Sequence, residues 1–159
     1  MTTQNMPVLA LRGLTAFPGQ TLSFDAEREI SILALENAME GDRELLLVTQ
    51  REIGVQEPQE EDLYDIGTVC RIFQIVKTSD TGVRVIAGGL HRAAIRRLWQ
   101  TKPFLQANVD LLEDEGWRAT DRTEALTRRT YALFGRYQEL VGNLSDQLVA
   151  SVLDIRDPG

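Results

Sequence analysis

Residues 9–39 read LALRGLTAFPGQTLSFDAEREISILALENAM, and this stretch decides the fold. An apolar strand reaches Leu14, and a corner follows at Phe17-Pro18-Gly19. Proline fixes φ and glycine permits a positive φ, so the Pro-Gly pair suits the centre of a turn between strands. A second apolar stretch runs through Leu22. The pattern therefore predicts two strands joined by a tight corner.

An amphipathic helix is predicted directly after the second strand. Asp25 is a plausible N-cap, the helix ends near Met39, and Gly41 follows as a natural stop. Its apolar positions recur at helical spacing and bury one face of the helix. These positions are Ile30, Leu33, Ala34, Leu35 and Ala38.

The next part of the chain combines a buried strand with a polar connection. Residues 45–48 are a short continuous apolar run, which is expected of a strand covered on both faces. Residues 51–65 form an acidic connection, and one helical turn is predicted at residues 60–64.

Three further segments read as strands, and the first two are joined by a hairpin. The polar run 78–82 ends in glycine and lies between β-rich segments, which indicates a hairpin. Gly88-Gly89 predicts a bulge or a corner that breaks the returning strand, so that residues 94–100 form a separate strand. Residues 104–112 supply the last strand. The expected fold is α+β, with about six strands in one partly closed barrel and one early helix.

The composition changes at residues 113–116, and this change predicts a domain boundary. The chain is therefore divided into a β-lobe, 1–115, and a helical extension, 116–159. The apolar residues of the extension follow helical steps, the first helix ends at Gly142, and Ser145 can cap a second helix that runs to Asp154. The residues that form the apolar stripe of the first helix are Leu126, Thr130, Leu133, Phe134, Tyr137, Leu140 and Val141. Two such helices without a third resemble an interrupted bundle, and we expect a longer natural chain.

Charge and composition exclude several classes of protein. The formal net charge is −7 and the sequence pI is about 4.8, which argues against a nucleic-acid surface. The N-terminus does not read as a secretory signal, and no window approaches the roughly 20 apolar residues that span a bilayer. Cys70 is the only cysteine, which is compatible with a reducing cytoplasm. We therefore expect a cytoplasmic protein without a membrane partner.

No residue pattern predicts catalysis, a metal site or a bound cofactor. His91 is the only histidine, and Cys70 lies in an apolar strand, where a buried inert thiol is the commonest state. The carboxylates near residues 57–65 lack calcium-loop spacing and are best interpreted as a solvated loop. Nothing resembles a phosphate-binding loop. The site prediction contains no catalytic, metal or cofactor residue.

The strongest candidate for function is apolar exposure at the corner. Leu14, Phe17, Pro18 and Leu22 are either buried plugs of the core or a patch that binds polypeptide. Both readings stay open, and these four residues are the predicted substrate-binding site. Trp99 is expected at the edge of the core and Trp117 at the junction with the helices, where either ring could instead meet a ligand.

Several segments, in order and with compatible spacing, resemble the N-terminal domain of the Lon family of ATP-dependent proteases. The resemblance includes the strand, the Phe17-Pro18-Gly19 corner and the helix of residues 9–39, and it covers about residues 7–112. The other matching segments are ELLLVTQ (44–50), EDLYDIGTVCRI (61–72), VRVIAGGLHRA (83–93) and PFLQA (103–107).

The resemblance implies a PUA-like β-lobe, followed by a helical subdomain. It also implies that the domain binds unfolded or damaged proteins for quality control and supports assembly of a homohexamer with other Lon subunits. ATP, Mg²⁺ and the Ser–Lys catalytic pair are then expected only in the full-length protease. Two alternatives remain, a stand-alone adaptor without an ATPase and, less favoured, a PUA-like RNA-binding module.

Overall fold

Six strands form the sheet in the first part of the computed structural model, which describes residues 3–113 and 120–155. They are β1 (Thr3–Leu11), β2 (Thr21–Ala26), β3 (Glu44–Thr49), β4 (Ile66–Lys77), β5 (Val83–Gln100) and β6 (Leu105–Leu111). Helix α1 (Glu29–Glu40) follows β2, and a 3-10 turn covers Glu60–Asp62, within the predicted helical turn. The predicted α+β class is confirmed.

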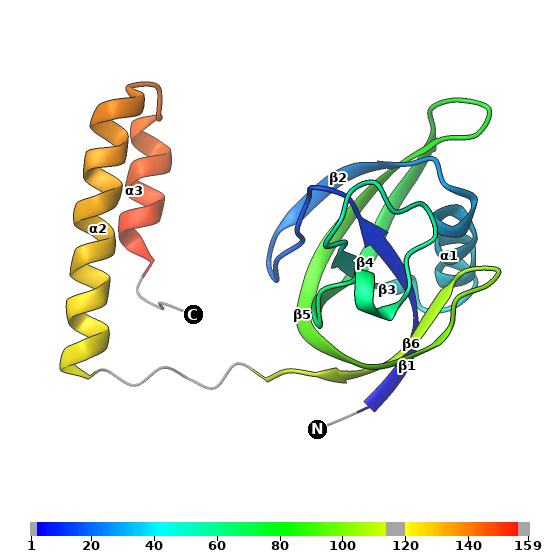
Figure 1. The fold of residues 1–159 in the computed structure, drawn as a ribbon. Helices are drawn as coiled ribbons and strands as arrows, with labels where there is room; N and C mark the ends of the chain where they lie inside the picture. Colours follow the sequence, from blue (N-terminus) through cyan, green and yellow to red (C-terminus); the bar gives the residue numbers. More distant parts are fainter. Residues whose placement is uncertain (1–2, 114–119, 156–159) are drawn as a thin grey trace. The chain divides into compact units, whose positions relative to one another are not determined.

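The strand pairings run round a ring, and α1 lies beside it (Figure 1). β1 pairs in parallel with β3 and antiparallel with β6. The antiparallel pairs β3–β4, β4–β5 and β5–β6 complete the circuit. β2 pairs with the first half of β5, whose second half pairs with β6. The sheet is therefore partly ring-like, as expected.

β5 is one continuous strand of 18 residues where the sequence predicted two. Its register against β4 shifts between Gly89 and His91, so the Gly-Gly pair marks a bulge and does not end the strand. A Cβ on Gly89 would lie 2.1 Å from the carbonyl oxygen of Phe17. Glycine at this position therefore lets the corner approach the sheet closely.

The core has two clusters of buried side chains, and β3 supplies both of them. Leu45 and Leu47 belong to one cluster, and Leu46 and Val48 belong to the other. Alternate side chains of a strand point to opposite faces, so β3 is covered on both sides, as its continuous apolar run predicts. Helix α1 contributes Leu35 to the first cluster.

Two predictions about the first elements are wrong. β1 ends at Leu11, and the chain continues to Leu14 as a loop. Asp25 lies inside β2, and α1 begins after Arg28, which makes no side-chain cap hydrogen bond. The carboxylate of Asp25 instead forms an ion pair across the sheet with Arg84, at 2.8 Å. The pairing of β2 with β5 therefore overrides the local capping signal.

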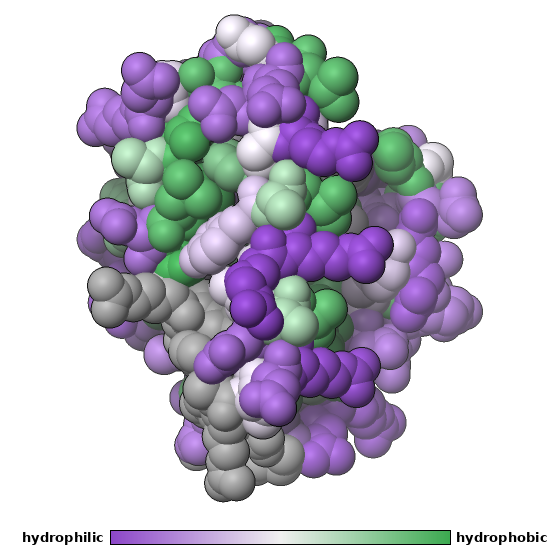
Figure 2. All heavy atoms as spheres, turned by 90° about the vertical axis from the view of Figure 1, so that its left-hand side faces the viewer, coloured by the Kyte–Doolittle hydropathy of each residue, from purple (hydrophilic) through white to green (hydrophobic). Residues whose placement is uncertain are grey.

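The second part of the chain contains two helices, α2 (Asp121–Val141) and α3 (Asp146–Asp154), which lie side by side (Figure 1). The predicted ends are confirmed, because Gly142 adopts φ = 67° at the C-cap of α2 and the Ser145 hydroxyl accepts a hydrogen bond from the Leu148 N–H. Both helices are described throughout, and neither contains a buried residue. Apolar side chains lie among polar ones on the face drawn in Figure 2.

The chain divides into two compact units, residues 1–113 and 114–159. The predicted boundary between residues 115 and 116 lies outside the described residues, as does Trp117. Independent folding of residues 1–115 stays a prediction. None of the described helices is long and apolar enough to cross a membrane.

Candidate functional site

Backbone hydrogen bonds hold the predicted corner in place. The Gln20 N–H donates to the Phe17 carbonyl at 3.2 Å, and Gly19 has φ = 73°, so Pro18 and Gly19 occupy the centre of the predicted turn. The Gly19 N–H donates to the Gly89 carbonyl of β5 at 3.0 Å, and the Thr68 hydroxyl donates to the Ala16 carbonyl at 2.7 Å. The corner is therefore tied to both β4 and β5.

The side chains of the four predicted binding residues separate into two groups. Phe17 is 59% exposed, Leu14 is 36% exposed, and Pro18 is half-buried. Leu22 belongs to β2, and its side chain is buried in the core. Ala16, and not Phe17, is the corner residue whose side chain enters the core. We define the corner patch as Leu14, Phe17 and Pro18.

Sequence analysis missed a further exposed apolar residue beside this loop. Ile53 is 61% exposed, and its Cδ1 lies 3.8 Å from the position of a Cβ on Gly13. The only sequence signal is one large apolar side chain within a polar connection. Ile53 lies next to Gly13 because the connection after β3 folds back along the end of β1.

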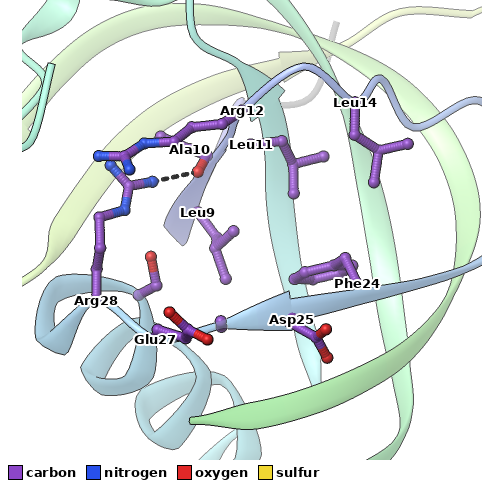
Figure 3. A pocket seen from close by; sticks show the side chains of 11 residues that line it. Leu9, Ala10, Leu11, Arg12, Leu14, Phe24, Asp25, Glu27 and Arg28 are labelled. Carbon is purple, nitrogen blue, oxygen red and sulfur yellow. Dashed lines mark hydrogen bonds between the residues drawn. The ribbon is translucent and has the colours of Figure 1, made fainter. Parts of the chain in front are cut away.

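A pocket of about 300 Å³ lies between the ends of β1 and β2 and includes Leu14 (Figure 3). Leu9, Leu11 and Phe24 supply apolar walls, and Arg12 and Arg28 stand together at one side. Sequence analysis did not predict this pocket, because only the fold brings its residues together.

Arg28 is held among neutral oxygen atoms. Its Nη2 donates to the Ala10 carbonyl at 2.5 Å, and its Nη1 donates to the Gln50 side-chain oxygen at 2.8 Å. Burial, and secondly the positive charge of Arg12, hold the pKa of Arg28 below its usual value. The Arg12 Nε–H is buried without a hydrogen-bond partner. Two half-buried positive charges therefore share one side of the pocket.

The single cysteine and the single histidine lie in different environments on neighbouring strands. Cys70 is buried, and burial raises the pKa of its thiol to about 12, so the reactive thiolate is scarce at neutral pH. His91 is exposed on β5. Within residues 3–113 and 120–155, no three histidine, cysteine or carboxylate side chains gather as a metal site would require.

The acidic connection does not converge on one point. Asp65 pairs with Arg51 at 3.2 Å, and a carboxylate oxygen of Glu60 accepts the Leu98 N–H at 2.8 Å. The Asp62 carboxylate instead accepts the Gln59 N–H at the start of the 3-10 turn. These carboxylates therefore organise the loop. Trp99 is 44% exposed, and its Nε1–H donates to Asn5 at 2.8 Å.

Two solved structures that share this fold are both described as Lon N-terminal domains. The N-terminal domain of the Mycobacterium avium complex Lon protease aligns with a TM-score of 0.73 and 20% identity, over 98% of this chain and 77% of that one. A Lon N-terminal domain protein from Xanthomonas campestris aligns with a TM-score of 0.56 and 16% identity, over 98% and 92% of the two chains. At these identities the likeness defines the class of fold.

Sequence relatives then identify the family. The model of the ATP-dependent protease La (LON) substrate-binding domain matches residues 5–159, and the chain belongs to this family. Lon protease of Brevibacillus choshinensis is 38% identical over 98% of this chain, and Lon protease of Clostridium acetobutylicum is 36% identical over 97%. The chain spans only about a fifth of the length of either relative, with 20% of each covered.

Proposed function

We propose that this chain is the N-terminal domain of a cytoplasmic Lon-type ATP-dependent serine protease and that it binds unfolded or damaged proteins. The remainder of such a protease would bind ATP and Mg²⁺ and would carry the Ser–Lys pair, so the domain itself needs no catalytic group. Support comes from membership in the substrate-binding family and from the fraction of the relatives that the chain spans.

The corner patch is the observation that carries this proposal. Its backbone is tied to β4 and β5, while Phe17 and Leu14 stay exposed. A rigid backbone spares the patch much of the ordering cost that a flexible loop would meet on binding. Contiguous exposed apolar surface on a folded domain usually marks an interaction site, and apolar side chains are what an unfolded client exposes.

Such a patch binds weakly on its own. Fully burying one large apolar side chain contributes about 1.5–3 kcal/mol before ordering costs are subtracted. In a homohexamer, which this domain would help to assemble, several patches could meet one client and raise its effective concentration. Weak single sites would then suffice for selecting long unfolded chains over folded ones.

Replacing Phe17 by Ser tests the proposal. We expect NMR titration with a reduced, unfolded client to shift amides of residues 14–24 more than those of the 78–82 hairpin. The Phe17→Ser variant should bind this client about threefold to tenfold more weakly, because part of the apolar contact is lost. Its melting temperature should stay nearly unchanged, because Phe17 is 59% exposed.

The matched control is Val76→Ser, which removes an exposed apolar side chain from β4. It should leave client affinity unchanged. Equal loss of affinity in both variants would contradict a specific role for the corner. Unfolding of the Phe17→Ser variant would instead show that Phe17 supports the core.

A further inference from the structure

The pocket between the ends of β1 and β2 has an apolar body and one charged side. Leu9, Leu11 and Phe24 point into it, and Arg12 and Arg28 stand together above them (Figure 3). Its volume of about 300 Å³ lies at the lower end of the range for ligand pockets. It therefore fits one or two residues of a peptide and not a long segment.

The hydrogen bonds described for the two arginines all end on neutral oxygen atoms. Arg12 donates from Nη2 to the Val55 carbonyl and to the Gln56 side-chain oxygen, both at 3.0 Å, and all hydrogen-bond acceptors of Arg28 are also neutral. Neither arginine is within ion-pair distance of an acidic group in the part of the chain that the structure describes. Because guanidinium groups bind carboxylates strongly, an anion placed between these two would offset their mutual repulsion.

The opposite wall of the pocket sets the direction in which such an anion would lie. Asp25 and Glu27 line that wall, away from the two arginines in Figure 3. Asp25 is already paired with Arg84 through two hydrogen bonds, of 2.8 and 2.9 Å. The arginine side attracts a ligand carboxylate and this acidic wall does not, so the carboxylate would lie toward Arg12 and Arg28.

β2 presents an open edge beside the pocket, whereas on the β1 side the Ala10 carbonyl already accepts a hydrogen bond from Arg28. β2 pairs only with β5 among the described strands, and the pairing of β1 with β6 stops at Val8. The pocket lining takes in Leu9–Arg12, where β1 has passed the end of its pairing with β6 but stays paired with β3 through Leu11. It also takes in Phe24–Glu27, where β2 is paired with β5 through Ala26 on its other edge. An open edge offers backbone N–H and C=O groups that pair with an extended peptide. The surroundings therefore favour a polypeptide over another carboxylic acid.

We propose that this pocket binds the C-terminal residue of an unfolded polypeptide, with its apolar side chain against Leu9, Leu11 and Phe24 and its carboxylate held by Arg12 and Arg28. The inference rests on the proposed function, since the ligand belongs to the same clients that the corner patch holds. Leu14 is common to the pocket and the patch, so one client can occupy both. Recognition of a chain end would add selectivity to sequence-tolerant apolar binding.

The experiment compares two peptides that differ only in the terminal charge. Both are short, unstructured, fluorescently labelled chains of Gly and Ser that end in Ala-Leu, one as the free acid and one as the amide. Fluorescence anisotropy with the 159-residue chain should give about tenfold to a hundredfold tighter binding of the acid, as expected for charged hydrogen bonds. Equal dissociation constants for the two peptides would overturn the inference.

Variants assign the preference to the arginines. Arg12→Gln should abolish most of the difference between acid and amide, and Arg12→Lys should keep part of it because the charge is retained. Arg97→Gln removes the same charge from an exposed position on β5 outside the pocket and should keep the full preference. A preference that survives in folded Arg12→Gln, or that disappears in Arg97→Gln, would contradict the assignment.

The outcome separates this inference from the proposed function. If a long unfolded client binds through Phe17 but the acid and amide peptides bind equally, the pocket assignment fails and the corner patch stands. If neither the client nor either peptide binds, both proposals fail. A preference for the acid without any binding of long clients supports the pocket and contradicts the role of the patch.

Discussion

The sheet unit and the helical unit both have amphipathic sequences, but among the described residues only those of the sheet unit have buried apolar side chains. In β3, Leu45 and Leu46 are completely buried, whereas in α2, Leu133 is 55% and Leu140 is 85% exposed. Residues from other parts of the chain cover both faces of β3, because its side chains belong to two core clusters. In the helical unit, residues 120–155 form two helices, and neither of them contains a buried residue. An apolar periodicity thus predicts an element but not the burial of its face.

Local interactions define the ends of the two helices. The Thr120 hydroxyl accepts a hydrogen bond from the Thr123 N–H, and Ser145 caps α3 in the same way. One tertiary contact between the helices is the hydrogen bond from the Tyr131 hydroxyl to the Ile155 carbonyl, at 2.6 Å. Caps of this kind are worth about 1 kcal/mol each, far less than a buried core. The stability of the whole chain should therefore come from the sheet unit.

The largest effect is expected when the sheet unit and the helical unit are expressed as separate fragments. Residues 1–115 alone should melt in one cooperative transition, because both core clusters lie within them. Residues 116–159 alone should be largely unfolded, since short helices need tertiary packing. Circular dichroism with thermal melting measures both fragments. A molten 1–115 fragment would mean that the two parts share one core.

The corner offers a smaller contrast within the sheet unit, between two glycines. Gly89→Ala should destabilise the chain by about 1–3 kcal/mol, because the new Cβ would meet the backbone of Phe17 at 2.1 Å. Gly54→Ala is the matched control, since nothing lies within 4 Å of its Cβ position, and should change stability by less than about 0.5 kcal/mol. Urea denaturation measures the free energy of unfolding of both variants. Equal changes would mean that the backbone at Phe17 can move away from the new Cβ at little cost.

Signals carried by neighbouring residues were enough to predict much of the fold. The Pro18-Gly19 turn, the hairpin at residues 78–82, the end of α2 at Gly142 and the cap at Ser145 each depend on a few adjacent residues. The continuous apolar run of β3 also carries its own evidence of burial on both faces.

Features that depend on distant partners could not be predicted in the same way. Asp25 looks like a helix cap until β2 pairs with β5 and places it beside Arg84, 59 positions further along the chain. Leu22 follows the same corner as Phe17, but strand alternation turns its side chain into the core. The pocket joins Arg12 to Arg28 through oxygen atoms of the loop after β3. No local pattern reports these arrangements.

The smallest expected effect concerns Asp110, a buried carboxylate in β6. The Thr3 hydroxyl donates to it at 2.6 Å and Arg96 pairs with it. The hydrogen bond from Thr3, and then that from Arg96, hold the pKa of Asp110 below its usual value. A carboxyl whose pKa is lower in the folded state stabilises the fold above its unfolded pKa of about 3.9. That stabilisation disappears as the pH falls through the folded pKa.

Asp110→Asn should therefore make the free energy of unfolding less dependent on pH below about pH 4, while lowering it at neutral pH. Urea denaturation at a series of pH values measures this slope. Asp25→Asn is the matched comparison, because the hydrogen bond from Arg84 also lowers the pKa of Asp25, but this ion pair is exposed. Added salt should screen the contribution of Asp25 more than that of Asp110. An unchanged acid slope in Asp110→Asn would show that other carboxylates govern acid unfolding of the sheet unit.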